Sequence, residues 1–406
     1  MCHHDSARLC IPGIEHAIGL TPTIVGMPTP DLSAIEAALA TVKDPEIHRP
    51  ITEIGMLKGV EISGGTVTVG GFLTISGCPM RETITDRSVA AVSKVPHVTE
   101  VLVELDVMSE EQRAELKKLL SGGADDREIP FSQPGSLTRV YAIASGKGGV
   151  GKSSLTANLA AAMADMGLSV GLVDADIYGH SIPRMLNATT PPTQVEGMIM
   201  PPTGYGVRVI SMAPFKPGGV TQPVAFRGPM LHRYLESFLK DVYWGDLDVL
   251  LLDLPPGTGD IALSTASLLP GAELVLVTTP QAAAADVAVR AGTLAAQTHQ
   301  KVAGVIENMS SFPCPKCGEP MDLFGIGGGS LVAEQLTEVL GTNVPLLGKI
   351  PFDVKLREGG DSGHPLVLSD PEAPASQAIR AIAEKLGKRP RGLAGMSLGI
   401  SSTRLK

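Results

Sequence analysis

The hydrophobic positions at the start of the chain follow two different periods. Residues 31–45 place apolar side chains at helical spacing, with Asp31 or Ser33 able to cap the helix and Pro45 able to end it. Residues 59–75 alternate around a Gly-Gly pair, which predicts a β-hairpin. A helix over 79–95, a strand over 98–107 and a surface helix over 110–122 follow. The pattern predicts a small α+β domain.

From Val140 the pattern changes to short, nearly continuous apolar runs that alternate with helical segments. The runs are 139–146, 169–176, 206–213, 248–255, 273–280, 302–309 and 345–351. A strand buried on both faces has no polar side, so such runs are typical of a parallel sheet between two layers of helices. We therefore predict an α/β fold with a mostly parallel sheet flanked by helices, preceded by the small α+β domain.

The chain has 406 residues, which is enough for two or three domains. The predicted divisions are a flexible extension (1–30), the α+β domain (31–120), a polar Gly/Pro-bearing linker (121–137), the α/β domain (138–389) and a flexible tail (390–406). Met27 is an alternative start.

Composition narrows the class of protein. A net charge of −9 disfavours broad nucleic-acid binding, and 3% aromatic residues do not suit a platform for stacking bases. No apolar run reaches the roughly 18 residues that a membrane span needs, and the N-terminus does not resemble a secretory signal. Five cysteines in 406 residues do not indicate a disulfide framework, so we expect the protein to be located in a reducing cytoplasm.

One glycine-rich loop predicts a nucleotide site. Gly146 to Ser153 fits G-x-x-x-x-G-K-S between a predicted strand and a predicted helix. Glycines let backbone N–H groups converge on phosphate oxygens, and the helix N-terminus adds a positive dipole. Lys152 is expected to reach the β- and γ-phosphates, and Ser153 to bind Mg²⁺. The residues assigned to ATP are Gly146, Lys147, Gly148, Gly149, Val150, Gly151, Lys152, Ser153 and Ser154.

Lys147 is a second lysine that an ordinary phosphate loop does not need. It is either a solvated loop residue or a cation that reaches the nucleotide of a second subunit. The K-G-G-x-G-K-S pattern resembles the deviant Walker A family, which contains the cell-division ATPase MinD, the partitioning ATPase ParA and the nitrogenase iron protein. That resemblance implies a P-loop α/β fold with nucleotide held between two subunits, and a catalytic role for Lys147 and Lys152.

The same resemblance implies roles for polar residues at strand ends. Asp176 would orient the attacking water and Asp174 would lie near Mg²⁺, although both could merely cap a strand end. Asp253, which ends a very apolar run, looks like the family's Walker B aspartate, which holds Mg²⁺ through water. A carboxylate at the end of so apolar a run is costly unless it is paired or linked to a metal. Asn308 resembles an adenine-contacting asparagine, or is a turn residue.

Cys314 and Cys317 form a Cys-Pro-x-Cys pair in the loop after residues 302–309. A redox pair of the thioredoxin kind sits at the start of a helix, whereas Pro320 and a glycine-rich stretch follow here. Structural zinc and an iron–sulfur cluster both accept four thiolates, so spacing alone does not separate them. Either metal site would need two further ligands.

Several motifs in order resemble the Mrp/ApbC type of iron–sulfur cluster carrier. They are "SGKGGVGKSS", "DADIYGHSIP", "FRGPM", "DLPPGTGD", "ENMSSFPCPKCG" and "REGGDSGHPL", spread over 138–389. The resemblance implies a homodimer that binds ATP and Mg²⁺. Cys314 and Cys317 of each chain would hold one cluster, expected to be 4Fe-4S, between the subunits. His180 stands where the family pattern has proline.

The first domain, through "DPEIHRPITEIGMLKGVEI" and "LTISGCPMRETI", resembles the small iron–sulfur-assembly-associated domain fused to some of these carriers. Cys78 within it is either a small buried thiol or a transient contact to a cluster or a target.

The leading prediction is a cytoplasmic, ATP-hydrolysing carrier that passes clusters to apo iron–sulfur proteins, works with cluster scaffold proteins and uses neither nucleic acid nor membrane. One alternative is a positioning ATPase like MinD or ParA, but the tail has no charged and apolar stripe for a membrane, and the acidic balance disfavours DNA. A zinc-bridged dimeric ATPase scaffold is the other.

Overall fold

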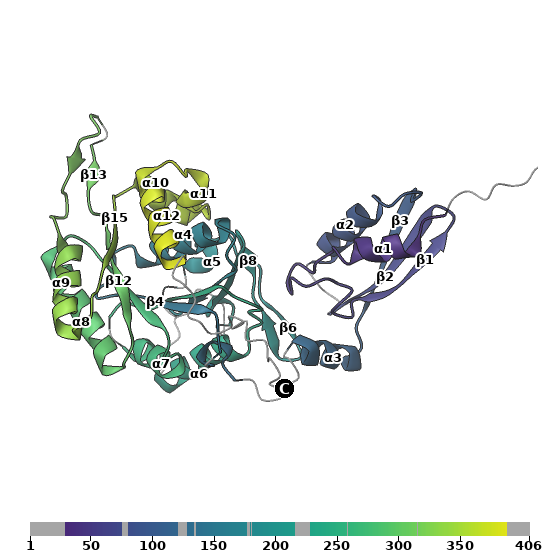
Figure 1. Cartoon of the computed structure of the whole chain (residues 1–406), viewed down its shortest axis with the longest axis horizontal. Helices are drawn as coiled ribbons and strands as arrows, with labels where there is room; N and C mark the ends of the chain where they lie inside the picture. Colours follow the sequence, from purple (N-terminus) through teal and green to yellow (C-terminus); the bar gives the residue numbers. More distant parts are fainter. Residues whose placement is uncertain are drawn as a thin grey trace, which may run out of the picture.

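The computed structural model describes residues 29–74, 80–120, 128–133, 135–176, 179, 181–215, 228–257, 259–314 and 316–387. Within them the chain forms a small α+β region and a larger α/β region (Figure 1). Four sequence-based predictions lie outside the described residues: those for the N-terminal extension apart from Thr29 and Pro30, for Cys78, for His180 and for the tail.

The small region is a three-stranded sheet with helices on one face. Its elements are α1 (Leu32–Leu39), β1 (Leu57–Ser63), β2 (Thr66–Leu73), α2 (Arg81–Val92), β3 (Glu100–Val107) and α3 (Glu110–Leu120). β1 and β2 form the predicted antiparallel hairpin, and α2 crosses over to β3, which runs parallel to β2. Every second residue of β2 is buried, because only one face of this sheet carries helices.

The first helix begins as predicted but ends early. Asp31 caps α1 by accepting a 3.2 Å hydrogen bond from the backbone N–H of Ser33. The helix stops at Leu39, six residues before Pro45. The chain then closes a tight loop in which the Asp44 carboxylate accepts hydrogen bonds of 2.7 and 2.8 Å from two backbone N–H groups. Those bonds give the two backbone N–H groups a partner outside a helix, so the helix does not need to continue to Pro45.

The large region is built on one eight-stranded sheet. Its strands are β4 (Arg139–Ser145), β5 (Val170–Asp174), β8 (Thr203–Gly204), β9 (Val207–Ser211), β10 (Val249–Asp253), β11 (Glu273–Thr278), β12 (Val302–Asn308) and β15 (Leu346–Ile350). They lie in the order β15-β12-β11-β4-β10-β5-β9-β8, and all neighbours pair in parallel except β8 with β9. The predicted fold class is confirmed.

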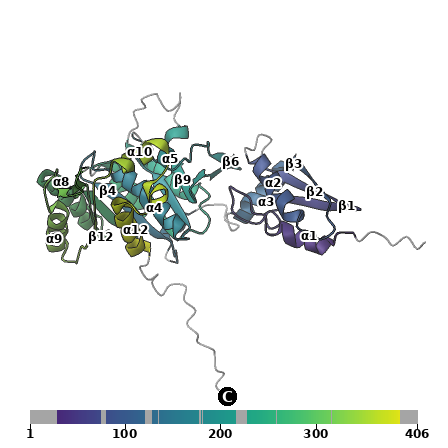
Figure 2. The same ribbon diagram turned by 90° about the horizontal axis from the view of Figure 1, so that it is seen from above.

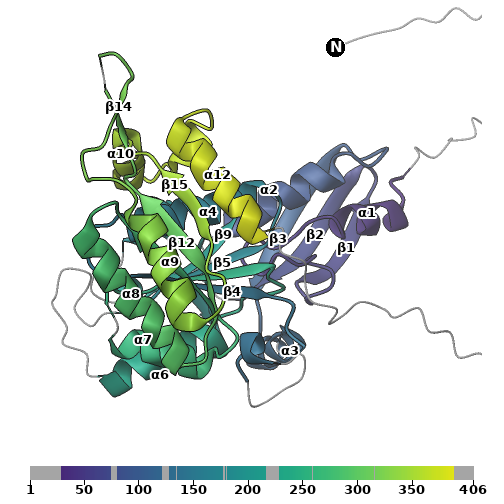
Figure 3. The same cartoon turned by 60° about the vertical axis from the view of Figure 1, so that its left-hand side comes forward.

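Helices cover both faces of this sheet (Figure 3). On one face lie α4 (Lys152–Asp165), α5 (Ile182–Met185), α10 (Val354–Ser362), α11 (Leu366–Ser369) and α12 (Pro374–Gly387). On the other lie α6 (Gly228–Lys240), α7 (Asp260–Leu268), α8 (Ala282–Gln297) and α9 (Gly328–Leu340). Central strand β4 contributes side chains to the hydrophobic cores on both faces of the sheet. Ala142 and Ala144 pack on the side of α6 to α9, whereas Tyr141 and Ile143 pack on the side of α4 and α12. This explains why its run of apolar residues is continuous.

A small hairpin joins the two regions. Its strands are β6 (Thr193–Val195) and β7 (Met198–Met200), and β6 lies beside α3 in two views (Figures 1 and 2). Met198 and Met200 pack into the hydrophobic core of the small region. The Thr193 hydroxyl donates a 3.1 Å hydrogen bond to Glu46, and Arg113 forms a 3.1 Å ion pair with Glu196. The large region thus contributes side chains to the core of the small one.

The shorter elements are two 3₁₀ turns (Pro130–Ser132 and Ala213–Phe215) and a short hairpin of β13 (Phe312–Pro313) and β14 (Pro320–Met321). Among the described residues, no helix has both the length and the apolar character needed to cross a membrane.

Candidate functional site

The predicted phosphate loop connects the end of β4 to the start of α4, at the carboxyl edge of the sheet. Gly149 and Gly151 both have φ of +79°, a left-handed conformation that favours glycine. A Cβ on Gly151 would also collide with the side-chain amide of Asn308. α4 begins at Lys152, so its free backbone N–H groups face the loop. The local geometry is that of an anion cradle.

Lys152, Ser153 and Asp253 come together behind this loop. Lys152 Nζ forms a 2.7 Å ion pair with Asp253 Oδ1 and has no further partner among the described atoms. Ser153 donates a 2.6 Å hydrogen bond to Asp253 Oδ2, and the Thr156 hydroxyl lies 2.8 Å from Oδ1. Asp253 is fully buried. The cluster therefore holds a charged carboxylate with three polar partners.

Asp174 lies beside Asp253, because β5 and β10 pair in parallel with these two residues in register. Burial raises the pKa of Asp174 well above its usual range, and the charges of Asp253 and Asp176 raise it further. Its Oδ1 is buried without a hydrogen-bond partner. Asp176, two residues after Asp174, accepts a 3.0 Å hydrogen bond from the backbone N–H of Gly179.

These residues fit a nucleotide and its magnesium ion. The buried Lys152 ammonium and the buried Asp174 oxygen both lack hydrogen-bond partners, and buried polar atoms normally have them. Lys152 and the N–H groups at the start of α4 would hold phosphate oxygens, while Ser153, Asp253 and Asp174 offer oxygen ligands for Mg²⁺. When bound, the ion would neutralise charge on the transferring phosphoryl group.

Lys147 is half-buried and lies apart from the buried cluster. Its Nζ donates a 2.7 Å hydrogen bond to Gln281 Oε1, at the start of α8. Ser154, on the first turn of α4, is half-buried beside Gly360 of α10. Neither residue touches the buried cluster through a contact that the structure describes, and the catalytic role of Lys147 remains a prediction.

Asn308 connects β12 to the phosphate loop. Its Nδ2 donates a 2.8 Å hydrogen bond to the carbonyl of Val150, and the side chain is buried. The preceding residue, Glu307, accepts a 2.6 Å hydrogen bond from the backbone N–H of Gly329 and so fixes the start of α9. The adenine contact expected of Asn308 remains a prediction; the contact that the structure describes is with the loop itself.

Cys314 and Cys317 lie on the β13–β14 hairpin, which projects from the body of the large region (Figure 3). Phe352 packs against Phe312 at the base, with ring centroids 5.6 Å apart. The turn is closed by a 2.8 Å hydrogen bond from Gly318 N–H to the Cys314 carbonyl. The hairpin is therefore anchored at its base and carries both cysteines in the segment between its two strands.

The turn between the cysteines favours a thiolate. Backbone N–H groups of Cys317 and Lys316, together with the Cys317 thiol, lower the pKa of Cys314. Cys317 is exposed and Cys314 is half-buried. Among the described residues, no group of three or more His, Cys, Asp or Glu side chains is placed to hold a metal ion. The pair thus supplies two soft ligands and leaves the others to come from elsewhere.

Sequence reasoning missed three partners of the site. Thr156 lies one helical turn after Lys152, a spacing that could have suggested it. Gln281 follows β11, the neighbour of β4, so its place near the loop could have been expected from the sheet order alone. Glu307 carried no signal apart from being a carboxylate in an apolar run.

Comparison with known proteins assigns the family. Residues 136–387, well over half of the chain, match the family described as NUBPL iron-transfer P-loop NTPase. The chain belongs to this family. Residues 32–103 of this iron-transfer P-loop NTPase match a second family, described as iron-sulfur cluster assembly protein.

Two relatives with the same name are similar along most of their length. An iron-sulfur cluster carrier protein from Mycobacterium tuberculosis is 59% identical over 373 residues, covering 92% of this chain and 97% of its own. One from Deinococcus radiodurans is 41% identical over 355 residues, covering 87% and 94%. A solved nucleotide-binding protein from Archaeoglobus fulgidus in complex with ADP is 34% identical, with a TM-score of 0.47 over 58% of this chain and 89% of its own.

Proposed function

We propose that this protein is an ATP-hydrolysing iron–sulfur cluster carrier that binds its cluster between two copies of the chain and passes it to apoproteins. The observation that carries the proposal is the cysteine hairpin. Cys314 and Cys317 lie together on a projecting turn, with the pKa of Cys314 lowered and no third ligand among the described residues. Two such turns related by a two-fold axis supply four thiolates.

Apolar side chains next to the hairpin support the pairing of two chains. Met321, Leu323 and Ile326 follow Cys317 and are exposed by 38%, 58% and 77%. Apolar side chains clustered on one surface are typical of an interaction site. We infer that a second copy covers them when the cluster is bound.

The nucleotide would bind at the carboxyl edge of the sheet, where the phosphate loop lies. Lys147, which is half-buried, would reach across to the partner's nucleotide, and Asp176 would orient the attacking water. The cluster itself is cargo, so its release to an apoprotein needs no change in the oxidation state of the protein. The alternative functions are a zinc-bridged dimeric ATPase scaffold and a positioning ATPase.

The test is anaerobic reconstitution with iron and sulfide. We expect a coloured protein with labile sulfide that transfers its cluster to a small apo-ferredoxin. A Cys314→Ser/Cys317→Ser variant should retain almost no cluster, whereas Cys10→Ser, the matched cysteine control, should behave as wild type. Zinc without labile sulfide in the anaerobically purified protein, or full cluster retention by the double variant, would overturn the proposal.

A further inference from the structure

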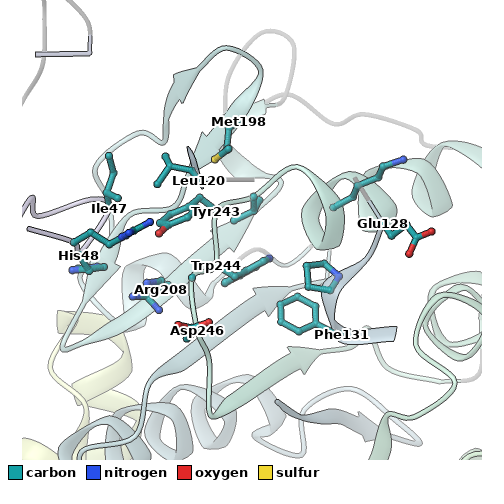
Figure 4. A pocket seen from close by; sticks show the side chains of 15 residues that line it. Ile47, His48, Leu120, Glu128, Phe131, Met198, Arg208, Tyr243, Trp244 and Asp246 are labelled. Carbon is teal, nitrogen blue, oxygen red and sulfur yellow. The ribbon is translucent and has the colours of Figure 1, made fainter. Parts of the chain in front are cut away.

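A cavity of about 760 Å³ lies where the small and the large region meet, and none of its lining residues belongs to the phosphate loop or the cysteine hairpin (Figure 4). Ligand cavities commonly have volumes of this order. His48 comes from the loop after α1, Arg208 from β9, and Trp244 from the segment before β10. The site described above makes no use of these side chains.

One cation in this cavity stands out. The Arg208 side chain is half-buried, and its Nε is fully buried without a hydrogen-bond partner. Burial lowers the pKa of Arg208, and the nearby Tyr243 and Asp246 only partly offset this. A desolvated guanidinium with unused donors is costly, and an anion that accepts from it would remove that cost.

Two other charged side chains of the cavity have partners that the structure describes. Arg49 forms a 3.4 Å ion pair with Glu53, and Glu128 accepts a hydrogen bond from Gln133. Burial, together with nearby cations, lowers the pKa of His48 to about 4, so this imidazole is neutral at neutral pH and can donate or accept a hydrogen bond. Arg208, with Asp246 nearby, is thus the lining cation that has a buried nitrogen without a hydrogen-bond partner.

The far wall of the cavity is aromatic. Trp244 and Phe131 stand edge to face, with ring centroids 6.4 Å apart. The indole N–H donates a 2.8 Å hydrogen bond to the Phe238 carbonyl, so it is not free for a ligand, and the two residues are largely buried, Trp244 at 3% and Phe131 at 8% exposed. A ligand that met both Arg208 and this wall would need a charged end and an apolar body.

We propose that this cavity binds a small organic anion whose carboxylate or phosphate group meets the Arg208 guanidinium and whose apolar part lies against Trp244 and Phe131. A guanidinium fork matches either group in two-pronged fashion. Because the lining comes from both regions, the bound anion holds them together. This proposal is independent of the cluster-carrier function.

Trp244 is the only tryptophan of the chain, so its fluorescence reports on this cavity directly. The probes are benzoate, phenyl phosphate and, as the uncharged counterpart, benzyl alcohol. We expect a saturable change with at least one anion, at a Kd of about 1 mM or below. We also expect that anion to raise the midpoint of urea unfolding, because it binds only the folded chain. The tighter anion identifies the preferred charged group.

Arg208→Gln should weaken this binding about tenfold or more, as expected when a charged hydrogen bond is lost. Arg208→Lys keeps the charge without the fork and should weaken it by a smaller factor. Arg357→Gln, at an exposed arginine of α10, is the matched control and should bind as wild type. The proposal would be overturned if neither anion saturated the fluorescence change by about 10 mM, or if benzyl alcohol bound with the same affinity as the anions. It would also be overturned if the anion bound with unchanged affinity to an Arg208 variant that folds.

Discussion

The Asn308 side chain, at the carboxyl end of β12, donates a 2.8 Å hydrogen bond to the Val150 carbonyl of the phosphate loop. The cysteine hairpin begins only four residues later, at Phe312. One buried amide thus ties the nucleotide loop to the strand that leads into the predicted cluster ligands. This contact gives a physical route by which nucleotide binding and the position of the hairpin can depend on each other.

Asn308→Ala is predicted to weaken ATP binding. The change leaves the buried Val150 carbonyl without its donor, which costs about 1–3 kcal/mol and loosens the loop. Isothermal titration with ATP and Mg²⁺ should show affinity reduced by about tenfold. Asn343→Ala, at an exposed position after α9, is the control. Unaltered affinity in Asn308→Ala would show that the loop does not depend on this bond.

Lys147→Ala is predicted to slow ATP hydrolysis while leaving ATP affinity nearly unchanged. Lys147 is only half-buried, and Gln281 is the partner described for its side chain, so the variant should fold normally. Gln281→Ala removes that partner and keeps the lysine. If the lysine acts on the nucleotide of a second subunit, steady-state turnover should fall in the first variant and persist in the second. Equal losses in the two variants would assign Lys147 a role within its own chain.

Asp174→Asn is predicted to stabilise the chain and to reduce hydrolysis. Because the pKa of Asp174 is raised by burial and by its neighbours Asp253 and Asp176, the ionised carboxylate is penalised in the folded state, and stability is lost as the pH rises through that pKa. A neutral amide removes the penalty. Thermal unfolding at pH 7 should show a higher midpoint, while magnesium-dependent turnover falls. Asp322→Asn, at an exposed position, should change neither; a lower midpoint for Asp174→Asn would contradict the assignment.

His48 is predicted to make the chain less stable in mild acid. Its pKa of about 4 in the folded chain lies below the ordinary value near 6.5, so the unfolded state takes up the proton first. Stability from the neutral imidazole is present above pH 6.5 and is lost as the pH falls toward 4. The side chain is partly exposed, and with solvent screening we expect an effect of about 1–2 kcal/mol.

His48→Asn is the variant for this test, because His48 has φ of +60° and asparagine tolerates that conformation. Urea midpoints at pH 7 and pH 5, followed through Trp244 fluorescence, should fall less in the variant than in the wild type. An identical fall in both would mean that His48 does not contribute. The raised pKa values of Asp44 and Glu46 act in the opposite direction and are common to both proteins.

The sheet and the phosphate loop could be predicted from sequence because each has a strong local signal. β4 and β10 are apolar on both faces, and the glycines of the loop occupy positions with positive φ. The early end of α1 could not be predicted, since it depends on Asp44 bonding the backbone of the loop that follows. Local pattern carries no information about such contacts.

The cysteine hairpin and the joining hairpin are harder cases. β13 and β14 have two residues each, too few for an alternating pattern, although the cysteine spacing itself was visible. The β6–β7 hairpin reads as an ordinary surface turn, yet Met198 and Met200 lie in the core of the small region. Its role depends on packing between segments far apart in sequence, as does the cavity beside it.

The central claim is that each chain carries half of a cluster site. The most direct measurement is iron and labile sulfide per chain, together with native mass, on one anaerobically reconstituted sample without nucleotide. We predict about two iron atoms per chain, all in a dimer, with about four per pair of chains. A monomer that carries a full complement of iron through Cys314 and Cys317 would contradict the account.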